Sequence, residues 1–316
     1  MTDLRISPIA VRLAVIAGFI LLHSPIHTVW AEAEGGTTGA NFLRMPIGAR
    51  AIGMGGTFTS VADNATAIYW NPSGLAAVNW REVSMSHQLL YQGLRLSQVC
   101  YAHPMSKGLT VAAGLVYWGA GSLDARDERD VPTGSFDISD MALTAGVGWK
   151  LLPELYVGGN VKAIQETIQD EKGTTAAADV GGLYQYYLED QTVYAGLAVK
   201  DVGGKIGPGQ KSDLPSSVHA SVSDRLFNET IIVSSEAELY NDVAWKGQAG
   251  AEFFLPGSVS LRVGYRFREN NVSGIEGLTA GFGFIYSQSQ DYVIDYAYAG
   301  QGDLGTAHHI SLSLRF

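Results

Sequence analysis

Hydrophobic and polar residues alternate along most of the chain after residue 81. Residues 258–268 alternate apolar with polar or small side chains, and residues 140–149 and 278–286 repeat the pattern. Because successive side chains of a strand point to opposite faces, this alternation predicts a sheet with one apolar face. We predict fourteen strands, at residues 82–89, 94–103, 108–118, 137–149, 154–167, 174–187, 192–202, 214–226, 230–240, 243–255, 258–268, 275–288, 290–299 and 305–316.

The second face of these strands distinguishes a membrane barrel from a soluble sandwich. It carries mostly Gly, Ser, Thr and Ala, whereas the wet face of a sandwich is usually rich in Lys and Glu. Aromatic residues stand near the ends of the apolar rows, as Trp149, Tyr265 and Tyr286 do. Strands of about 10 to 12 residues, tilted near 45°, span the roughly 25 Å apolar band of an outer-membrane barrel. The pattern therefore predicts an all-β fold, a 14-stranded antiparallel transmembrane β-barrel.

The connections and the C-terminus agree with this interpretation. Single-chain bacterial barrels have an even number of strands, with short periplasmic turns and longer outer loops. The predicted even-numbered connections are short, and the odd-numbered ones are mostly longer, the longest being residues 119–136. The last strand ends on Phe316, which resembles the signal read by the barrel-assembly machinery. We expect outer-membrane lipid and lipopolysaccharide to surround the barrel.

The N-terminus predicts export. Arg5 and Arg12 precede a ten-residue apolar core at 13–22, and small residues allow cleavage after Ala31. This is the signal-peptide pattern, and the core is short for the alternative, an uncleaved anchor. The expected organisation is a signal peptide at 1–31, an N-terminal hatch at 32–81 and a barrel at 82–316, located in the bacterial outer membrane.

Composition excludes several other classes. Of the 316 residues, 46% are hydrophobic, which is too many for a disordered chain. Cys100 is the single cysteine, so a disulfide scaffold is excluded, and a net charge of −10 disfavours binding to nucleic acid. Only 16% of residues are charged, against about a quarter in soluble domains. The 38 glycines would thin the inner face of the barrel and leave room for a hatch.

Charged strand residues are expected to face the lumen, because Arg or Lys on the lipid face costs roughly 2–4 kcal/mol at mid-bilayer. A three-residue loop at 256–258 would place Glu252 opposite Arg262 on neighbouring strands. These side chains would form either a structural network that fills the lumen or a path for a ligand. The predicted lumenal residues are His219, Glu236, Glu238, Lys246, Glu252, Arg262, Arg266, Asp295 and Arg315.

The segment before the barrel is not strand-like. Residues 63–68 predict a short helix capped by Asp63, and Pro72 and Gly74 would end it. A compact element directly before a barrel is well placed to plug it.

Three stretches of this segment, residues 48–56, 62–65 and 69–76, resemble the PorV/PorQ family of FadL-like outer-membrane proteins. Ser73 departs from the Asn-Pro-Ala usual there. The resemblance implies a 14-stranded barrel with a hatch in its lumen. The hatch-motif residues that carry it are Arg50, Gly53, Met54, Gly55, Asp63, Trp70, Asn71 and Pro72.

The resemblance implies one of two non-enzymatic functions. The first is type IX-type protein secretion, or surface delivery of exported proteins, with a translocon or exported cargo as partner. The second is a FadL-like channel for long-chain fatty acids or other hydrophobic small molecules. A channel should show an apolar pocket between hatch and wall and a break in the wall for lateral exit. A secretion partner should bind cargo or translocon through its loops.

No motif predicts catalysis, a metal or a cofactor. The nucleophile elbow Gly-x-Ser-x-Gly is missing from the sequence. The acidic stretch at 124–130 lacks the residue order of a calcium loop and is expected to be a solvated surface loop, with a divalent-ion site shared with lipopolysaccharide as the alternative. His308 and His309 would face opposite sides of a strand and so could not chelate one ion together.

Overall fold

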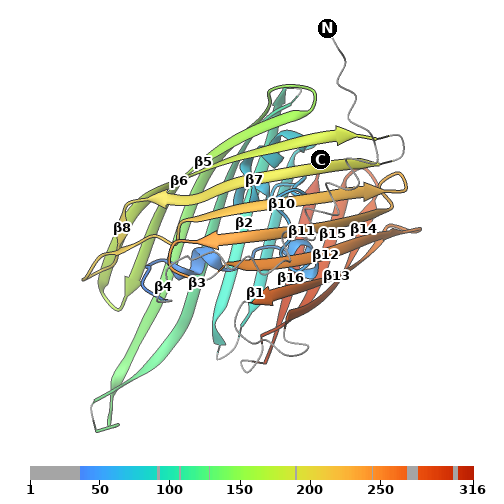
Figure 1. Ribbon diagram of the computed structural model, residues 1–316. Helices are drawn as coiled ribbons and strands as arrows, with labels where there is room; N and C mark the ends of the chain where they lie inside the picture. Colours follow the sequence, from blue (N-terminus) through green and yellow to red (C-terminus); the bar gives the residue numbers. More distant parts are fainter. Residues whose placement is uncertain are drawn as a thin grey trace.

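The computed structural model describes residues 36–316 apart from 91–92, 107, 128, 189–190, 244, 269–276 and 302–304. The predicted signal peptide lies outside the described residues. Fourteen antiparallel strands close into a barrel, in which each strand pairs with its neighbours in the chain and β1 pairs with β16 (Figure 1). The barrel strands are β1 (Glu82–Leu89), β2 (Arg95–Ser106), β3 (Leu109–Arg126), β4 (Pro132–Lys150), β5 (Leu155–Ile168), β6 (Glu171–Tyr187), β7 (Thr192–Gly203), β10 (Ser217–Leu226), β11 (Ile231–Tyr240), β12 (Lys246–Leu255), β13 (Val259–Arg268), β14 (Leu278–Ser287), β15 (Asp291–Gly300) and β16 (Thr306–Arg315).

The predicted fold class is confirmed, and two predicted loops are wrong. Residues 119–136 were expected to be a loop, but β3 and β4 extend into this stretch from both sides as a long hairpin, so the connection is confined to the residues between Arg126 and Pro132. The backbone bonds of an antiparallel ribbon tolerate polar side chains, so a hydrophilic stretch can still pair. Asp124 therefore lies in β3 rather than in a loop. The connection at 203–213 also holds a two-stranded sheet, β8 (Lys205–Ile206) with β9 (Ser212–Asp213).

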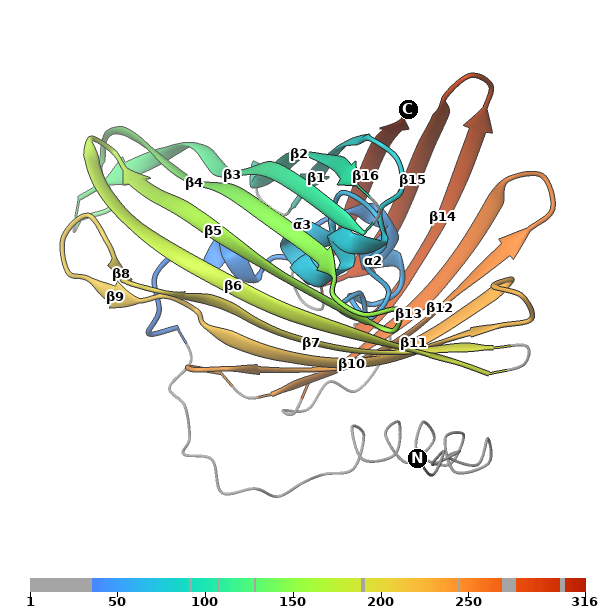
Figure 2. The same ribbon diagram turned by 90° about the horizontal axis from the view of Figure 1, so that it is seen from above.

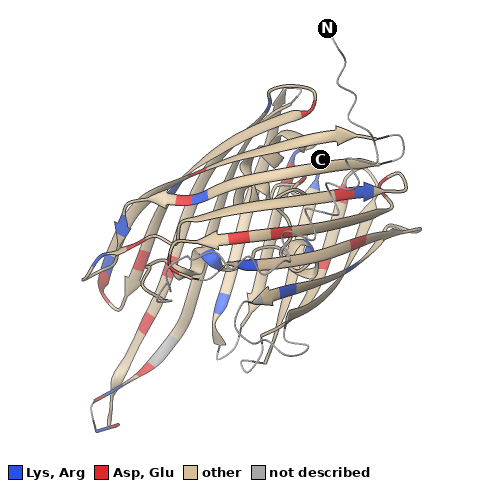
Figure 3. Ribbon diagram, in the orientation of Figure 1, with Lys and Arg blue, Asp and Glu red and all other residues tan. Residues whose placement is uncertain are grey.

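The outer surface of the barrel is apolar, as the alternation predicts. Outward side chains such as Leu261 and Phe282 are 46% and 48% exposed, while their neighbours in the sequence Arg262 and Gly281 face inward. Charged residues are sparse along the strands (Figure 3). Among the described residues, no helix is long and apolar enough to cross a membrane.

The N-terminal segment at 36–81, here called the hatch, lies inside the barrel (Figure 2). It consists of η1 (Asn41–Arg44), α2 (Ala49–Gly53), α3 (Ala67–Trp70) and η2 (Pro72–Ala77). Helix η2 packs against β4, β5 and β6, and α2 packs against β13 to β16 on the other side of the lumen. The hatch has its own buried centre, which includes Met54, Phe58, Ile68 and Leu75.

Glycines on the inner face of the barrel allow this close packing. A Cβ atom on Gly158 would lie 2.3 Å from the carbonyl carbon of Pro72, and one on Gly264 would lie 2.1 Å from the amide nitrogen of Gly55. Real side chains do not approach so closely, so any larger residue there would displace the hatch. The expectation that glycines thin the lumenal face is confirmed at these positions.

The predicted helix cap is wrong. Helix α3 begins at Ala67 with Thr66 at its N-cap position, and Asp63 lies outside the helix. Pro72 does not simply end this helix but starts the next one, η2, whose N-cap Asn71 accepts a hydrogen bond from the backbone N–H of Ser73. Proline suits the first position of a helix because its missing N–H would be unpaired there.

Candidate functional site

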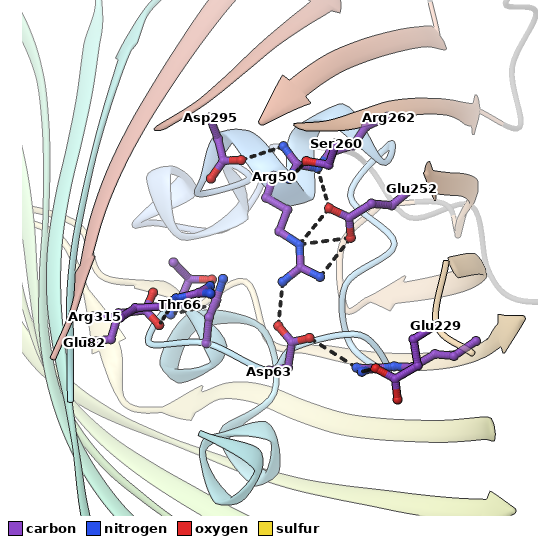
Figure 4. A network of polar contacts seen from close by, with 12 residues as sticks. Arg50, Asp63, Thr66, Glu82, Glu229, Glu252, Ser260, Arg262, Asp295 and Arg315 are labelled. Atoms are coloured by element: carbon purple, nitrogen blue, oxygen red, sulfur yellow. Dashed lines mark hydrogen bonds and ion pairs between the residues drawn. The ribbon is translucent and has the colours of Figure 1, made fainter. Parts of the chain in front are cut away.

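Arginine–carboxylate pairs join the hatch to the barrel wall (Figure 4). Arg50 of α2 contacts both oxygens of Glu252 in β12, with Nε at 3.1 and 3.0 Å and Nη2 at 2.8 Å from Oε2. Its Nη1 lies 2.5 Å from Oδ1 of Asp63. Asp63 in turn accepts from Arg225 of β10 at 3.2 Å. Two hatch residues are thereby fixed to β10 and β12, two strands on the same side of the lumen that are separated by β11.

The wall continues this network. Arg262 donates from Nε to Glu252 at 2.7 Å and from Nη1 to Asp295 at 2.6 Å. Glu252 and Arg262 occupy directly opposite positions on β12 and β13, which confirms the register predicted from the three-residue loop. Glu252 is fully buried, and the guanidinium groups of Arg50 and Arg262 both compensate its charge. A buried carboxylate needs such partners.

The electrostatics of the hatch follow from these contacts. Burial alone would raise the pKa of Asp63, but the positive charges of Arg50 and Arg225 outweigh it and lower the pKa from 3.8 to about 2. Burial disfavours the charged form of Arg50, but the negative charges of Asp63 and Glu252 outweigh this effect and raise the pKa of Arg50 well above its ordinary value. Asp63 and Arg50 are therefore both charged across the physiological pH range.

The remaining hatch-motif residues stabilise the fold of the hatch and its packing against the barrel wall. The Asn71 amide donates to the carbonyl oxygens of Thr59 and, in β6, Gly182, at 2.9 and 3.2 Å. The Trp70 indole donates to the carbonyl of Ile47 at 3.0 Å and meets the Phe58 ring edge-to-face. Of the other motif residues, Gly53 accepts from Thr279 through its carbonyl, the backbone of Met54 and Gly55 lies against wall glycines, and Pro72 packs on Gly158.

Two spaces flank the hatch. The start of β1 and the end of β16 lie at one end of the barrel, together with the short turn between β12 and β13; we call this the turn end and the opposite one the loop end. A vestibule of about 950 Å³ opens at the turn end, and Arg50, Asp63 and Arg225 line it. A smaller cavity of about 110 Å³, the loop-end cavity, lies between the hatch and the wall.

The loop-end cavity is mostly apolar on the hatch side and mostly polar on the wall side. The hatch contributes the apolar side chains Phe42, Leu43, Met45, Ile47, Ile52 and Trp70. The wall contributes Val116, Ala142 and Phe267 together with polar side chains, namely Lys162, Lys200, His219, Glu238, Tyr240, Lys246, Gln248 and Arg266. The hatch also contributes the charged side chain Arg44, so a hydrophobic molecule would find mostly apolar contacts on the hatch and mostly polar groups on the wall.

The predicted lumenal residues divide between the two ends. Glu252, Arg262, Asp295 and Arg315 line the vestibule, where Arg315 also stacks on Trp80 with its Cζ 4.7 Å from the ring centre. Glu238, His219, Lys246 and Arg266 line the loop-end cavity. Glu236 is buried against the hatch and accepts from Thr59, and Phe316 closes the barrel through backbone hydrogen bonds with Arg81.

Sequence reasoning missed several lumenal charges. Lys162 of β5 is buried between Asp179 of β6 and Asp201 of β7, at 2.9 and 2.6 Å. In the hatch, Arg44 pairs with Asp242 beyond β11. Alternation could have placed Lys162 on the inner face, since Asn160 and Ile164 share it. Nothing in the local pattern indicates its partners, which come from other strands.

Comparisons with known proteins support the fold. No protein-family model matches the sequence, and no curated protein matches it either. The structure is similar to the toluene transporter TbuX of Ralstonia pickettii (TM-score 0.59, 13% identity, covering 85% of this chain and 97% of TbuX). It is also similar to a FadL homologue of Pseudomonas aeruginosa (0.57, 12%, 90% and 99%) and to the monoaromatic hydrocarbon channel CymD (0.57, 11%, 85% and 96%). At these identities the likeness shows a FadL-like barrel fold.

Proposed function

We propose that this chain is an outer-membrane barrel that admits hydrophobic small molecules. The apolar outer wall suits a lipid environment, and the FadL-like fold supports the outer membrane as its location. The similar structures include proteins described as a toluene transporter and a monoaromatic hydrocarbon channel. These similarities favour the channel, the second of the two functions that the hatch motif implies, over protein secretion.

The loop-end cavity is the single observation that carries this proposal. A channel for hydrophobic molecules requires an apolar pocket between hatch and wall, and this cavity has six apolar hatch side chains on one side. Ligand pockets are typically apolar with a few polar groups that fix orientation. On this proposal the cavity is the first binding position for a molecule that enters from the loop end.

Passage beyond the cavity would need the hatch to move. Within the described residues, strand pairing is continuous around the barrel, so the lateral break that a side exit requires is not seen there. The hatch separates the loop-end cavity from the vestibule, and the Arg50–Glu252 pair holds it to the wall. We propose that the molecule passes between the hatch and the wall when α2 moves away from the four strands on which it packs, β13, β14, β15 and β16.

The secretion function stays a prediction from the hatch motif alone. No contact or cavity among the described residues favours it specifically. It is kept as an alternative outcome of the experiment below.

The test uses a strain that lacks the gene, complemented with variants of the full chain. We expect deletion to reduce uptake of radiolabelled toluene or fatty acid and to leave the surface proteome unchanged. Loss of exported proteins from the surface with normal uptake would overturn the channel proposal and favour secretion.

A reversible cross-link tests whether the hatch must move. The hydroxyl oxygens of Ser60 in the hatch and Ser221 in β10 lie 2.7 Å apart, so sulfur atoms in their places would be within reach of a disulfide. The Ser60→Cys, Ser221→Cys double variant should take up substrate only when reduced. Each single variant is the matched control. Equal uptake by the oxidised and reduced double variant would show that passage does not require the hatch to leave β10.

A further inference from the structure

A buried histidine and two buried glutamates meet on the wall beside the hatch. His219 of β10 lies opposite Glu238 in the register of β10 with β11, and Glu236 is two residues before Glu238 on the same face. The Nδ1 atom of His219 is 3.1 Å from Oε1 of Glu236 and 3.6 Å from Oε1 of Glu238. One ligand atom from each residue lies within 4.8 Å of the others. All three side chains are buried.

These distances match the ligand shell of a small divalent ion. Zinc binds nitrogen and oxygen ligands at about 2.0–2.1 Å in a tetrahedron, whose ligand atoms are then about 3.3 Å apart. The two histidine–carboxylate distances lie on either side of this value, and 3.6 Å is too long for a hydrogen bond. A single imidazolium could compensate only one of two ionised carboxylates, whereas a divalent cation would compensate both.

The surrounding side chains already hold each ligand in place. The Ser217 hydroxyl lies 3.0 Å from Nε2 of His219, which leaves Nδ1 facing the carboxylates. The hatch residue Thr59 donates to Glu236 from its backbone N–H at 3.0 Å and from its hydroxyl at 2.6 Å. Tyr240 donates from its hydroxyl to Glu238 at 2.9 Å. Metal ligands characteristically have such outer partners, which orient them and tune their affinity.

A fourth oxygen is available beside the cluster. Gln248 lies opposite Glu236 in the β11–β12 register, and its side-chain amide hydrogen-bonds to Glu238. Its carbonyl oxygen is buried, and within the described part of the chain it has no hydrogen-bond partner. An ion could reach the cluster through the loop-end cavity, because His219, Glu238 and Gln248 all line it. The ammonium group of Lys246 lies nearby over the Tyr240 ring, and its positive charge would lower the affinity for a cation.

We infer that His219, Glu236 and Glu238 form a binding site for a divalent transition-metal ion of the zinc class. His219 would bind through Nδ1 in its neutral form, Glu236 and Glu238 through one oxygen each, and the Gln248 carbonyl or a water would complete the shell. Because Glu236 also accepts from Thr59, the ion would rigidify a junction between hatch and wall. The alternation along each strand predicts lumenal positions but no metal site, since only the pairing of β10 with β11 brings the three residues together.

The test measures metal binding by the purified full chain in detergent after treatment with a chelator. Cobalt(II) serves as the probe, because tetrahedral cobalt absorbs visible light strongly, and zinc content after desalting gives the stoichiometry. We expect one equivalent of either metal and a rise in unfolding temperature with zinc. His219→Gln and Glu238→Gln should abolish stoichiometric binding, and Thr59→Val should weaken it about 10- to 100-fold.

The matched control is His308→Gln, which removes an exposed histidine of β16 and should leave binding unchanged. Circular dichroism establishes that each variant is folded. If His219→Gln does not fold, Glu238→Gln and Thr59→Val carry the test. Absence of stoichiometric binding by the wild-type chain, or unchanged affinity in the folded variants, would overturn the proposal. Uptake is not the readout, so failure here leaves the proposed function intact.

Discussion

Arg50 of the hatch and Glu252 of β12 form a two-pronged ion pair across 202 positions of sequence, with three contacts of 2.8 to 3.1 Å. Arg262 reaches the same carboxylate from the wall side. The fully buried Glu252 therefore has one arginine from the hatch and one from the barrel. Removal of Arg50 would leave the Arg262–Glu252 pair of the wall intact. The effect of removing Arg50 therefore reports how strongly this contact holds the hatch.

Arg50→Ala should loosen the hatch without unfolding the barrel. Breaking a buried pair costs about 3–5 kcal/mol, and the Arg50 side chain is slightly exposed, so we expect a loss near the lower figure. Hydrogen exchange of the amides at 48–58 should accelerate accordingly. Arg126→Ala is the control, because its pair with Asp130 is exposed and contributes little. Unchanged exchange in Arg50→Ala would show that apolar packing alone retains the hatch.

Acid should release the hatch partly through Asp63. Its pKa is lowered to about 2, below the ordinary 3.8, so the ionised form is favoured in the closed structure. The stabilisation from its pairing is complete above about pH 4 and is lost as the pH falls from about 4 to about 2. Hydrogen exchange of the hatch, measured from pH 5 to pH 2, should follow this loss.

Asp63→Asn isolates this contribution from that of the other carboxylates. The variant should exchange faster than the wild type at pH 5, and the difference should shrink towards pH 2. A constant difference across this range would mean that Asp63 titrates at its ordinary pKa or does not hold the hatch.

Enlarging the wall beneath the hatch should also destabilise the closed state. A Cβ on Gly158 would lie 2.3 Å from the Pro72 backbone, so Gly158→Ala forces η2 away from β5. Such overpacking typically costs about 1–3 kcal/mol. Gly209→Ala is the control, since no atom lies within 4 Å of the added Cβ. We expect a lower unfolding temperature for Gly158→Ala alone, and equal values for the two variants would contradict the close packing.

The strands were predictable because their environment repeats every second residue. Lipid-facing side chains must be apolar and lumenal ones are small or paired, so Leu261 and Arg262 indicate their faces without knowledge of any partner. The register of Glu252 with Arg262 also followed, because a three-residue loop fixes the pairing of adjacent strands. These are local consequences of strand geometry.

Contacts between elements that are not consecutive in the chain could not be predicted. Arg225 meets Asp63 because the hatch lies in the lumen, and Lys162 meets Asp201 because β5 and β7 both pair with β6. The assignment of Asp63 as a helix cap failed for the same reason, since its arginine partners outweigh the local preference of aspartate for helix starts. The hatch motif indicated which residues matter but not what they contact.

Filling the loop-end cavity should block uptake without disturbing the ion pairs of the hatch. Ala142 of β4 is buried and lines the cavity, whereas Ala163 of β5 points outward. Ala142→Phe would place a ring in a space of about 110 Å³, so we expect at least a tenfold fall in uptake of radiolabelled toluene or fatty acid by complemented cells. Ala163→Phe adds the same ring on the lipid side and should transport normally.

Both variants should reach the outer membrane in equal amounts, which antibody labelling of fractionated membranes can establish. Normal uptake by a correctly folded Ala142→Phe variant would mean that the molecule does not cross through the loop-end cavity.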